Sequence, residues 1–444
     1  MGDIADDALE LAPFRGLRYA TPGARPAVDP PPPNIALALA PPYDVLDAAA
    51  VSGLMRAEPH NAVRLTVPPA ATAANGSTRA LAGPDRYARA AATFQRWIDD
   101  GVLVRDSEPL LYVYEQTAPD GTRQRGLVGA LRLPRPGSAA VRPHEDVLSE
   151  PVADRARLMA AAHANLEPIF LLYRGGTGAQ RGLASRTVDA VADSTTTPLV
   201  RTTTDDQVTH RVWAIADPRL QADIAADFAT RTALIADGHH RYAAYQRLRA
   251  AQQGPGAWDH GLALLVDSDA TPPRVGAIHR VLPDLDAAGA ARAAGTVAEV
   301  EPVQVDGDDS LRAALGRLAK AAADGPAMLL VGGGAGHLLH GFDPGRLAAA
   351  MPGRSPAWRA LPTAVLTRVL LPLWNRTDET ARLVHDDPAG AVAALRPDRD
   401  SAVILPALSV ADVYAVTAVG ELTPRKSTSF GPKPRTGLVM RTLL

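Results

Sequence analysis

The stretch that most constrains this chain is residues 233–249, where a short apolar run meets one glycine, two histidines and an arginine. Ala233–Ala236 are predicted to end a buried strand, and Asp237 and Gly238 to form a tight turn. A helix is predicted from His239 onward, because apolar and aromatic residues recur at helical spacing up to the stop signal Gly254-Pro255. A strand that passes through a glycine into a helix is therefore the local structure expected here.

Such a turn favours an anion. The first N–H groups of a helix lack intrahelical partners, and the aligned peptide dipoles act there like about half a positive charge. Arg241 adds a planar cation that can grip phosphate oxygens, and His239 and His240 add two imidazoles in the same turn. We therefore predict that Gly238, His239, His240 and Arg241 bind a polyphosphate. The alternative is that Arg241 pairs with a nearby carboxylate and that the histidines are ordinary surface residues.

The segment Gly-His-His-Arg-Tyr-Ala-Ala-Tyr-Gln at 238–246 resembles the phosphate loop of sulfiredoxin, where Gly-Cys-His-Arg-Tyr opens the helix that holds ATP. It is also similar to the Gly-Glu-Arg-Arg nucleotide motif of ParB-type proteins. The catalytic cysteine of sulfiredoxin falls on His239, and the chain has no cysteine, so only the nucleotide seat carries over. Within that superfamily, the free-serine kinases are similar in pairing such a loop with a carboxylate base, and Asp237–Arg241 resembles them more than it resembles sulfiredoxin.

Over almost its full length, the chain resembles the family labelled domain of unknown function 1015, a label that implies no reaction. The resemblance rests on the order and spacing of short motifs: Pro13–Gly16, Ala40–Val45, His144-Glu145, Asp154-Arg155, Ala164-Asn165, Asp237–Tyr242, His279-Arg280, Gly420-Glu421, Lys426–Thr428 and Pro432-Lys433.

These resemblances imply an α+β fold, with a ParB/sulfiredoxin-like mixed α/β core that carries large insertions. We place this nucleotide-binding core in residues 1–260 and a C-terminal α/β region in residues 261–444, whose tail is expected to return to the active cleft. The length of 444 residues also favours more than one hydrophobic core. Clear local signals are a helix at 85–99 and a hairpin of strands at 110–116 and 125–133 around Asp120-Gly121.

Two further carboxylates are candidates for chemistry. Asp44 follows a predicted strand at 35–39 in the rigid turn Pro41-Pro42-Tyr43-Asp44, where it either caps a helix over 45–55 or has a catalytic or metal-binding role. Glu145 stands beside His144 in a loop after the hairpin, ahead of a helix that starts near Asp154. That pair either lines a cleft or is an accident of sequence.

The loop 423–435 combines cations and hydroxyls between prolines. Lys426, Ser427, Thr428 and Lys433 are predicted to make a second phosphate or substrate contact, because Pro424, Pro432 and Pro434 lower the entropy lost when the loop closes on a ligand. A solvated tail and a loop that binds a partner protein or another subunit are the alternatives.

Composition narrows the class of protein. The formal net charge of −2 comes from interspersed signs, which argues against nucleic-acid binding. The acidic N-terminus lacks the features of a signal peptide, and no apolar run approaches the roughly 20 residues that span a bilayer. We therefore expect a cytoplasmic protein without membrane contact, and the sequence leaves its oligomeric state open.

The predicted function is that of a small-molecule kinase, which transfers a phosphoryl group from ATP or ADP to a hydroxyl metabolite, with free serine as the acceptor that the resemblance suggests. Magnesium is implied, because phosphoryl transfer needs charge neutralisation. Asp237, Asp44 and Glu145 are candidates for the base or for magnesium coordination, and Lys426 and Lys433 for neutralising the transition state. The alternative is a nucleotide-binding regulatory or scaffold protein that phosphorylates no metabolite.

Overall fold

The computed structural model describes residues 7–21, 32–68, 85–135 and 137–444, and these form two compact units. The first unit comprises residues 1–143, 147–273 and 432–444, and the second comprises residues 144–146 and 274–431. The predicted division after residue 260 is placed differently, since His260 begins a central strand of the first unit's sheet.

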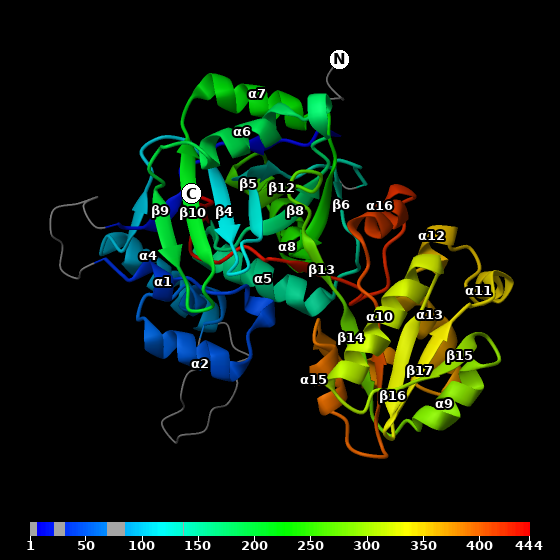
Figure 1. Ribbon diagram of the computed structural model, residues 1–444. Coiled ribbons are helices and arrows are strands. Elements are labelled where there is room, and N and C mark those ends of the chain that lie inside the picture. Colours follow the sequence, from blue (N-terminus) through cyan, green and yellow to red (C-terminus); the bar gives the residue numbers. More distant parts are fainter. Residues whose placement is uncertain (1–6, 22–31, 69–84, 136) are drawn as a thin grey trace. The chain divides into compact units, whose positions relative to one another are not determined.

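The first unit is built on a mixed nine-stranded sheet in the order β6-β11-β8-β12-β5-β4-β10-β9, with β1 paired to β5 (Figure 1). Most pairs are antiparallel, whereas β12 runs parallel to β8 and β6 runs parallel to β11. Its strands are β1 (Leu11–Ala12), β4 (Leu111–Thr117), β5 (Arg123–Arg132), β6 (Val141–Arg142), β8 (Ile169–Tyr173), β9 (Val200–Thr203), β10 (Thr209–Ile215), β11 (Ala233–Asp237) and β12 (His260–Asp267).

Smaller pairs and helices complete this unit. Strand β2 (Leu17–Tyr19) pairs with β3 (Leu103–Arg105), and β7 (Ala164–Asn165) with β21 (Arg441–Thr442) from the C-terminal segment. Helices α6 and α7 pack beside each other, as do α5 and α8, and α8 contacts β8 and β12 (Figure 1). The helices are α1 (Ile35–Ala38), α2 (Ala48–Ala57), α3 (Val63–Thr66), α4 (Asp85–Asp99), α5 (Ser149–Ala162), α6 (Leu183–Ala192), α7 (Pro218–Phe228) and α8 (His239–Ala250).

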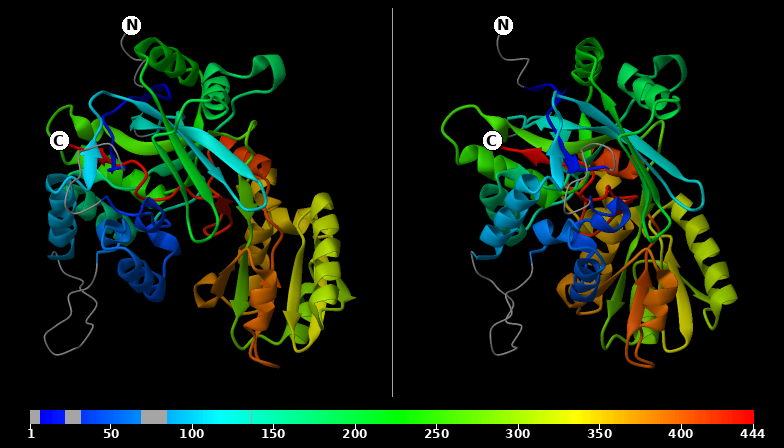
Figure 2. Two further views of the ribbon diagram at one scale, coloured as in Figure 1. Left: turned by 60° about the vertical axis from the view of Figure 1, so that its left-hand side comes forward. Right: turned by 90° about the vertical axis from the view of Figure 1, so that its left-hand side faces the viewer.

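The second unit has a six-stranded antiparallel sheet in the order β15-β17-β16-β19-β14-β18. Helix α10 runs alongside β16 and β17 (Figure 2), and its residues Leu311, Ala314 and Leu318 enter the core of this unit. The strands are β13 (Arg274–Gly276), β14 (Ile278–Leu282), β15 (Glu299–Val303), β16 (Met328–Gly332), β17 (Ala335–His340), β18 (Arg382–His385), β19 (Ser401–Ile404) and β20 (Ser429–Gly431). The helices are α9 (Ala287–Ala294), α10 (Asp308–Asp324), α11 (Pro344–Ala350), α12 (Pro356–Arg359), α13 (Pro362–Val365), α14 (Leu371–Leu373), α15 (Pro388–Ala393) and α16 (Val410–Ala418).

The predicted α+β class is confirmed by these two sheets and their helices. The helix at 85–99 and the hairpin about Asp120-Gly121 are confirmed as α4 and as β4 with β5. Both signals are local, because apolar periodicity and an Asp-Gly turn need no distant partner. No helix within the described ranges is long and apolar enough to cross a bilayer.

Two local predictions near the N-terminus are wrong. Residues 35–38 form helix α1 instead of a strand, because the Asn34 side chain accepts a hydrogen bond from the Ala36 N–H and so caps a first turn. Helix α2 starts at Ala48, where Asp47 accepts from the Ala50 N–H, so Asp47 and not Asp44 is its cap. The proline-rich segment 22–33, whose sequence predicts an exposed extended loop, lies mostly outside the described residues.

The centre of the first sheet generates a stability prediction. A Cβ at Gly126 in β5 would run into the backbone oxygen of Leu265 in β12, and backbone there cannot give way as a flexible side chain can. Gly126→Ala should therefore lower the free energy of unfolding by about 1–3 kcal/mol, measured by urea unfolding. Gly53→Ala is the matched control: helix α2 leaves open space at that position, so alanine should raise stability by about 0.5–1 kcal/mol. Equal stability of the Gly126 variant and wild type would contradict this packing.

Candidate functional site

The first unit contains the predicted strand, turn and helix. All five residues of β11 are buried, Gly238 follows with φ of 92°, and α8 begins at His239. Glycine suits this left-handed position, where a side chain would be strained and its Cβ would lie 3.0 Å from Ile169 Cγ2. Helix α8 has no side-chain cap and no acidic residue in its first turn. The first turn of α8 therefore carries no acidic side chain that would compete with an anion for its backbone N–H groups.

Asp237 and Arg241 form a buried ion pair at this turn. Arg241 Nη2 donates to Asp237 Oδ2 at 2.6 Å, and Arg241 Nη1 donates to the Pro168 carbonyl at 2.6 Å. Burial would lower the pKa of Arg241, but the carboxylates of Glu167, Asp237 and Asp44 outweigh it and raise that pKa above its ordinary value. With 2% of its side chain exposed, Arg241 is a fixed cation that orients Asp237. This is the pairing that the alternative interpretation of the sequence described, and phosphate binding by Arg241 stays a prediction.

Lys433 joins two carboxylates from distant parts of the first unit. Its Nζ lies 2.5 Å from Asp237 Oδ1 and 3.1 Å from Asp44 Oδ2. Burial would lower the pKa of Lys433, but Asp237 and Asp44 more than offset this effect and the pKa is raised. The ammonium is therefore held in its charged form between the two carboxylates.

The turn that carries Asp44 is anchored on both sides. Glu167 Oε1 accepts from the Tyr43 N–H at 3.2 Å and from Thr436 Oγ1 at 3.1 Å. The backbones of Ala40 and Thr436 exchange two hydrogen bonds, which tie the C-terminal segment to the same turn. One buried carboxylate thus fixes the segments that bring Asp44 and Lys433 together.

The Tyr43 ring lies close to two guanidinium groups. The Cζ atom of Arg155 lies 4.1 Å from the ring centroid, and that of Arg241 lies 6.0 Å away. Burial raises the pKa of the Tyr43 hydroxyl to about 12, against the opposing effect of both arginines. The Tyr43 hydroxyl is consequently uncharged at neutral pH and does not act as a base there.

The two histidines of the turn differ in their surroundings. His239 is buried, whereas His240 Nε2 accepts a hydrogen bond from the Leu148 N–H at 3.2 Å. Because Nε2 is the acceptor, the proton of a neutral His240 ring is on Nδ1. Their predicted contact with a polyphosphate is untested.

The remaining predicted residues belong to the second unit. His144 Nε2 lies 2.9 Å from Thr428 Oγ1, the Lys426 N–H donates to Glu145 Oε2 at 3.2 Å, and Ser427 Oγ bonds to the Pro424 carbonyl. Lys426 has a left-handed φ of 56°, which the bond to Glu145 helps to hold. Glu145, Lys426, Ser427 and Thr428 therefore form one cluster, while Asp44, Asp237 and Lys433 form another in the first unit. A catalytic role for Glu145 and a phosphate contact of residues 426–428 stay predictions.

Among the described residues, no group of three or more His, Cys, Asp or Glu side chains is arranged to hold a metal ion. Asp44 and Asp237 together supply two candidate carboxylate ligands. Magnesium is commonly held by one or two carboxylates together with substrate phosphates, so a pair is compatible with an ion that arrives with a nucleotide.

Comparison with known proteins places the chain in a family. The family described as "Protein of unknown function (DUF1015)" matches residues 11–363. The chain belongs to DUF1015. No curated protein matches this DUF1015 sequence.

Solved structures show only a distant likeness to the DUF1015 chain. SbnI with a C-terminal truncation, from Staphylococcus aureus, has a TM-score of 0.36 and 9% identity, covering 71% of this chain and 87% of that one. A free serine kinase variant in complex with ADP has a TM-score of 0.33 and 14% identity, covering 66% and 84%. A conserved hypothetical protein from Pyrococcus furiosus has a TM-score of 0.32 and 14% identity, covering 68% and 92%. At these TM-scores, the function of the DUF1015 chain has to be argued from its own side chains.

Three residues that shape the DUF1015 site were not predicted as site residues: Glu167, Arg155 and Thr436. Each acts by fixing Tyr43 or the turn that carries Asp44. A signal for Glu167 does exist in the sequence, because a charged residue two positions before the apolar run Ile169–Leu172 lies where water is scarce.

The ion pairs of Lys433 predict how stability depends on pH. Lys433→Met should lower the free energy of unfolding at pH 7 by about 1–3 kcal/mol, which is less than the loss of one partner of a fully buried pair because Asp44 is partly exposed and Arg241 still faces Asp237. The folded-state pKa of Lys433 is raised, so its stabilisation is complete below the unfolded-state pKa of about 10.4 and is lost as pH rises through the folded-state value.

Urea unfolding followed by circular dichroism at pH 7 and above pH 10.4 measures this effect. The difference between wild type and Lys433→Met should shrink at the higher pH. Lys320→Met is the control, because Lys320 is exposed on α10 and its loss should change stability little. A difference that stays constant across this range would refute the ion-pair account.

Proposed function

We propose that this protein is a nucleotide-dependent phosphotransferase that phosphorylates a hydroxyl group of a small metabolite. The observation that carries the proposal is the ammonium of Lys433 between Asp44 and Asp237, directly at the N-terminus of α8. A cation for the transferred phosphoryl group, a carboxylate for the acceptor proton and a seat for phosphate oxygens are what this reaction requires.

The polyphosphate is proposed to sit on Gly238, His239 and His240. The first amides of a helix point outward without intrahelical partners, and α8 carries no acid in its first turn to compete for them. Arg241 is not part of this phosphate seat, because its guanidinium already donates to Asp237 and to the Pro168 carbonyl. We therefore assign Arg241 a positioning role.

Asp237 is the residue that would hold a magnesium ion bound with the nucleotide, which would leave the Asp44 carboxylate to serve as the base. The ion would supply charge neutralisation to the phosphates. If that ion replaced the ammonium at Asp237, Lys433 would be able to contact a phosphate oxygen. Its stem, which is largely buried, keeps it at the site.

Asp44 is the better candidate for the base. The side chain of Asp44 is 38% exposed, whereas that of Asp237 is 10% exposed and binds both Arg241 and Lys433. The acceptor hydroxyl oxygen attacks the terminal phosphorus, the bond from phosphorus to the bridging oxygen breaks, and the hydroxyl proton passes to the Asp44 carboxylate. The shortened nucleotide leaves with the bridging oxygen.

The acceptor is a small alcohol, and free serine is the one that the resemblance of Asp237–Arg241 to free-serine kinases suggests. A nucleotide-binding regulator remains the second function, supported by the same helix N-terminus. The two differ in one measurable property, because only the kinase produces a phosphomonoester.

Chemical labelling can locate the nucleotide, because Lys433 is one of three lysines in the chain, with Lys320 and Lys426. An acyl-phosphate derivative of ATP acylates lysines that lie near its phosphates. Peptide mass spectrometry should find Lys433 modified, with protection by excess ATP, while any modification of exposed Lys320 should not respond to ATP. ATP-sensitive labelling of Lys426 would support the predicted second contact. Absence of ATP-sensitive labelling at Lys433 would reject this seat.

Replacement of the proposed base tests the chemistry. Asp44→Asn should reduce turnover about 10²–10⁴-fold, the usual contribution of a general base, while nucleotide binding persists. The assay incubates the protein with magnesium, ATP or ADP and a pool of hydroxyl metabolites, and phosphorus NMR detects new phosphomonoesters. Asp47→Asn is the matched control, because asparagine also caps helices and should preserve both α2 and turnover. Nucleotide binding without any phosphomonoester from wild type would favour the regulator.

A further inference from the structure

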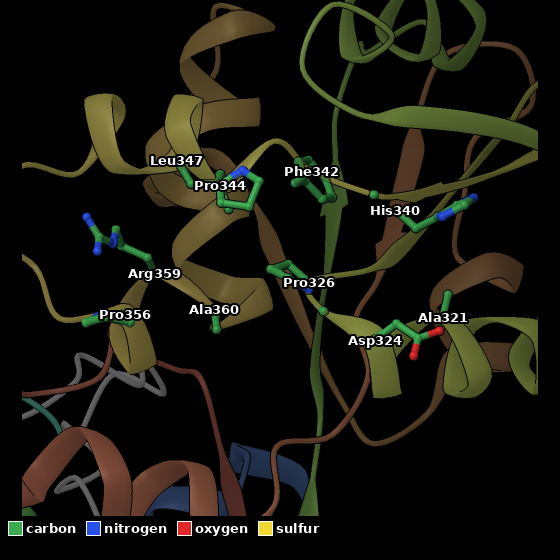
Figure 3. Close-up of a pocket in the computed structure, with 12 residues that line it drawn as sticks. Ala321, Asp324, Pro326, His340, Phe342, Pro344, Leu347, Pro356, Arg359 and Ala360 are labelled. Carbon is green, nitrogen blue, oxygen red and sulfur yellow. The ribbon is translucent and has the colours of Figure 1, made fainter.

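A second site, independent of the proposed phosphotransferase centre, lies wholly within the second unit. A cavity of about 420 Å³ opens where β17 ends and β16 begins, beside the last turn of α10 and the helices α11 and α12 (Figure 3). Its volume falls within the range of pockets that hold small organic ligands, roughly 300–1,000 Å³.

The walls of this cavity are apolar and stiff. Seven of its twelve lining residues are alanine, glycine or proline, which lose almost no side-chain entropy when a ligand orders them. Pro326, Pro344 and Pro356 present rigid rings, and Phe342 and Leu347 are buried side chains that close the apolar part. The pocket is thus largely preformed, which reduces the cost of binding.

The charged groups of the cavity are divided between two sides. Figure 3 shows Arg359 on one side and Asp324 and His340 on the other. Within the described part of the chain, the Arg359 guanidinium makes neither a hydrogen bond nor an ion pair. His340, by contrast, is already engaged, because its Nε2 lies 3.0 Å from Glu301 Oε1. Glu301 is also paired with Arg317 and lies outside the lining, so Asp324 is the acidic side chain of the lining, and the Arg359 side is where an anionic group is attracted.

We propose that this cavity binds a small organic acid with an apolar body. The carboxylate pairs with Arg359, whose planar fork matches two carboxylate oxygens, and the apolar body packs on the proline rings, Phe342 and Leu347. The negative side of the cavity repels the reversed orientation. The cavity therefore selects one orientation and one sign of charge of its ligand, which an apolar surface without charged groups would not do.

The test uses two probes with the same apolar body and opposite charge, 4-phenylbutyrate and 4-phenylbutylamine, titrated into the full chain without nucleotide. Calorimetry or ligand-observed NMR should give saturable, tighter binding of the anion. Arg359→Gln should weaken phenylbutyrate binding about tenfold or more, because it removes a charge-assisted hydrogen bond.

Two controls isolate this cavity. Arg312→Gln removes an exposed arginine of α10 that lies outside the lining and should leave phenylbutyrate affinity unchanged. Asp44→Asn should also bind the probe like wild type, so failure of the phosphotransferase proposal does not affect this one. The inference is overturned by an absence of saturable phenylbutyrate binding, by equal affinity for the amine, or by an Arg359→Gln variant that binds as wild type does.

Discussion

The contact of one ammonium with two carboxylates organises the candidate centre. Asp44, Asp237 and Lys433 come from three separate segments, and without the ammonium the two negative charges would repel each other in a partly dry environment. Removal of one member of such a group costs more than the group contributes as a whole, since it leaves a charge without compensation. The arrangement therefore fixes the geometry of the site even where its net contribution to stability is modest.

The polar groups around this contact are of two kinds: buried side chains that hold the site in place, and more exposed side chains that can reach a ligand. Glu167, Arg155 and Arg241 are buried and engaged with backbone or ring atoms, which leaves them little freedom to respond to a ligand. Asp44 is the more exposed carboxylate, and Lys433 can rotate on its four-carbon stem. Rigid support beneath a few adaptable groups is what a preorganised site requires, because the supporting bonds are already formed before substrate arrives.

The sequence predicted the parts of this centre that depend on neighbours along the chain. The strand, glycine turn and helix at 233–250 follow from an apolar run, a residue that tolerates positive φ and helical periodicity. The pairing of Arg241 with Asp237 also has a local signal, since the two are four residues apart. By contrast, Asp44 and Asp47 are three residues apart ahead of the same helix, and the ion pair of Asp44 with Lys433 depends on a residue from the far end of the sequence. The contact between Lys433 and Asp237 has no local signal in the sequence, because the two residues are far apart along the chain. The helix at 35–38 was not predicted because its start depends on a single side-chain hydrogen bond from Ala36 N–H to Asn34.

The return of residues 432–444 to the first unit has a consequence for biosynthesis. Thr436 pairs with Ala40, Met440 with Leu17, and Arg441 with Asn165, yet all of these tail residues are translated after residues 274–431 have been made. Domains generally fold as units while the chain emerges. The nascent first unit must therefore wait without Lys433 beside Asp44 and Asp237 while the entire second unit is synthesised. A chain whose translation ends before residue 433 contains Asp44 and Asp237 but lacks the Lys433 ammonium that contacts both. The end of translation therefore sets the moment at which this ion-paired centre can form.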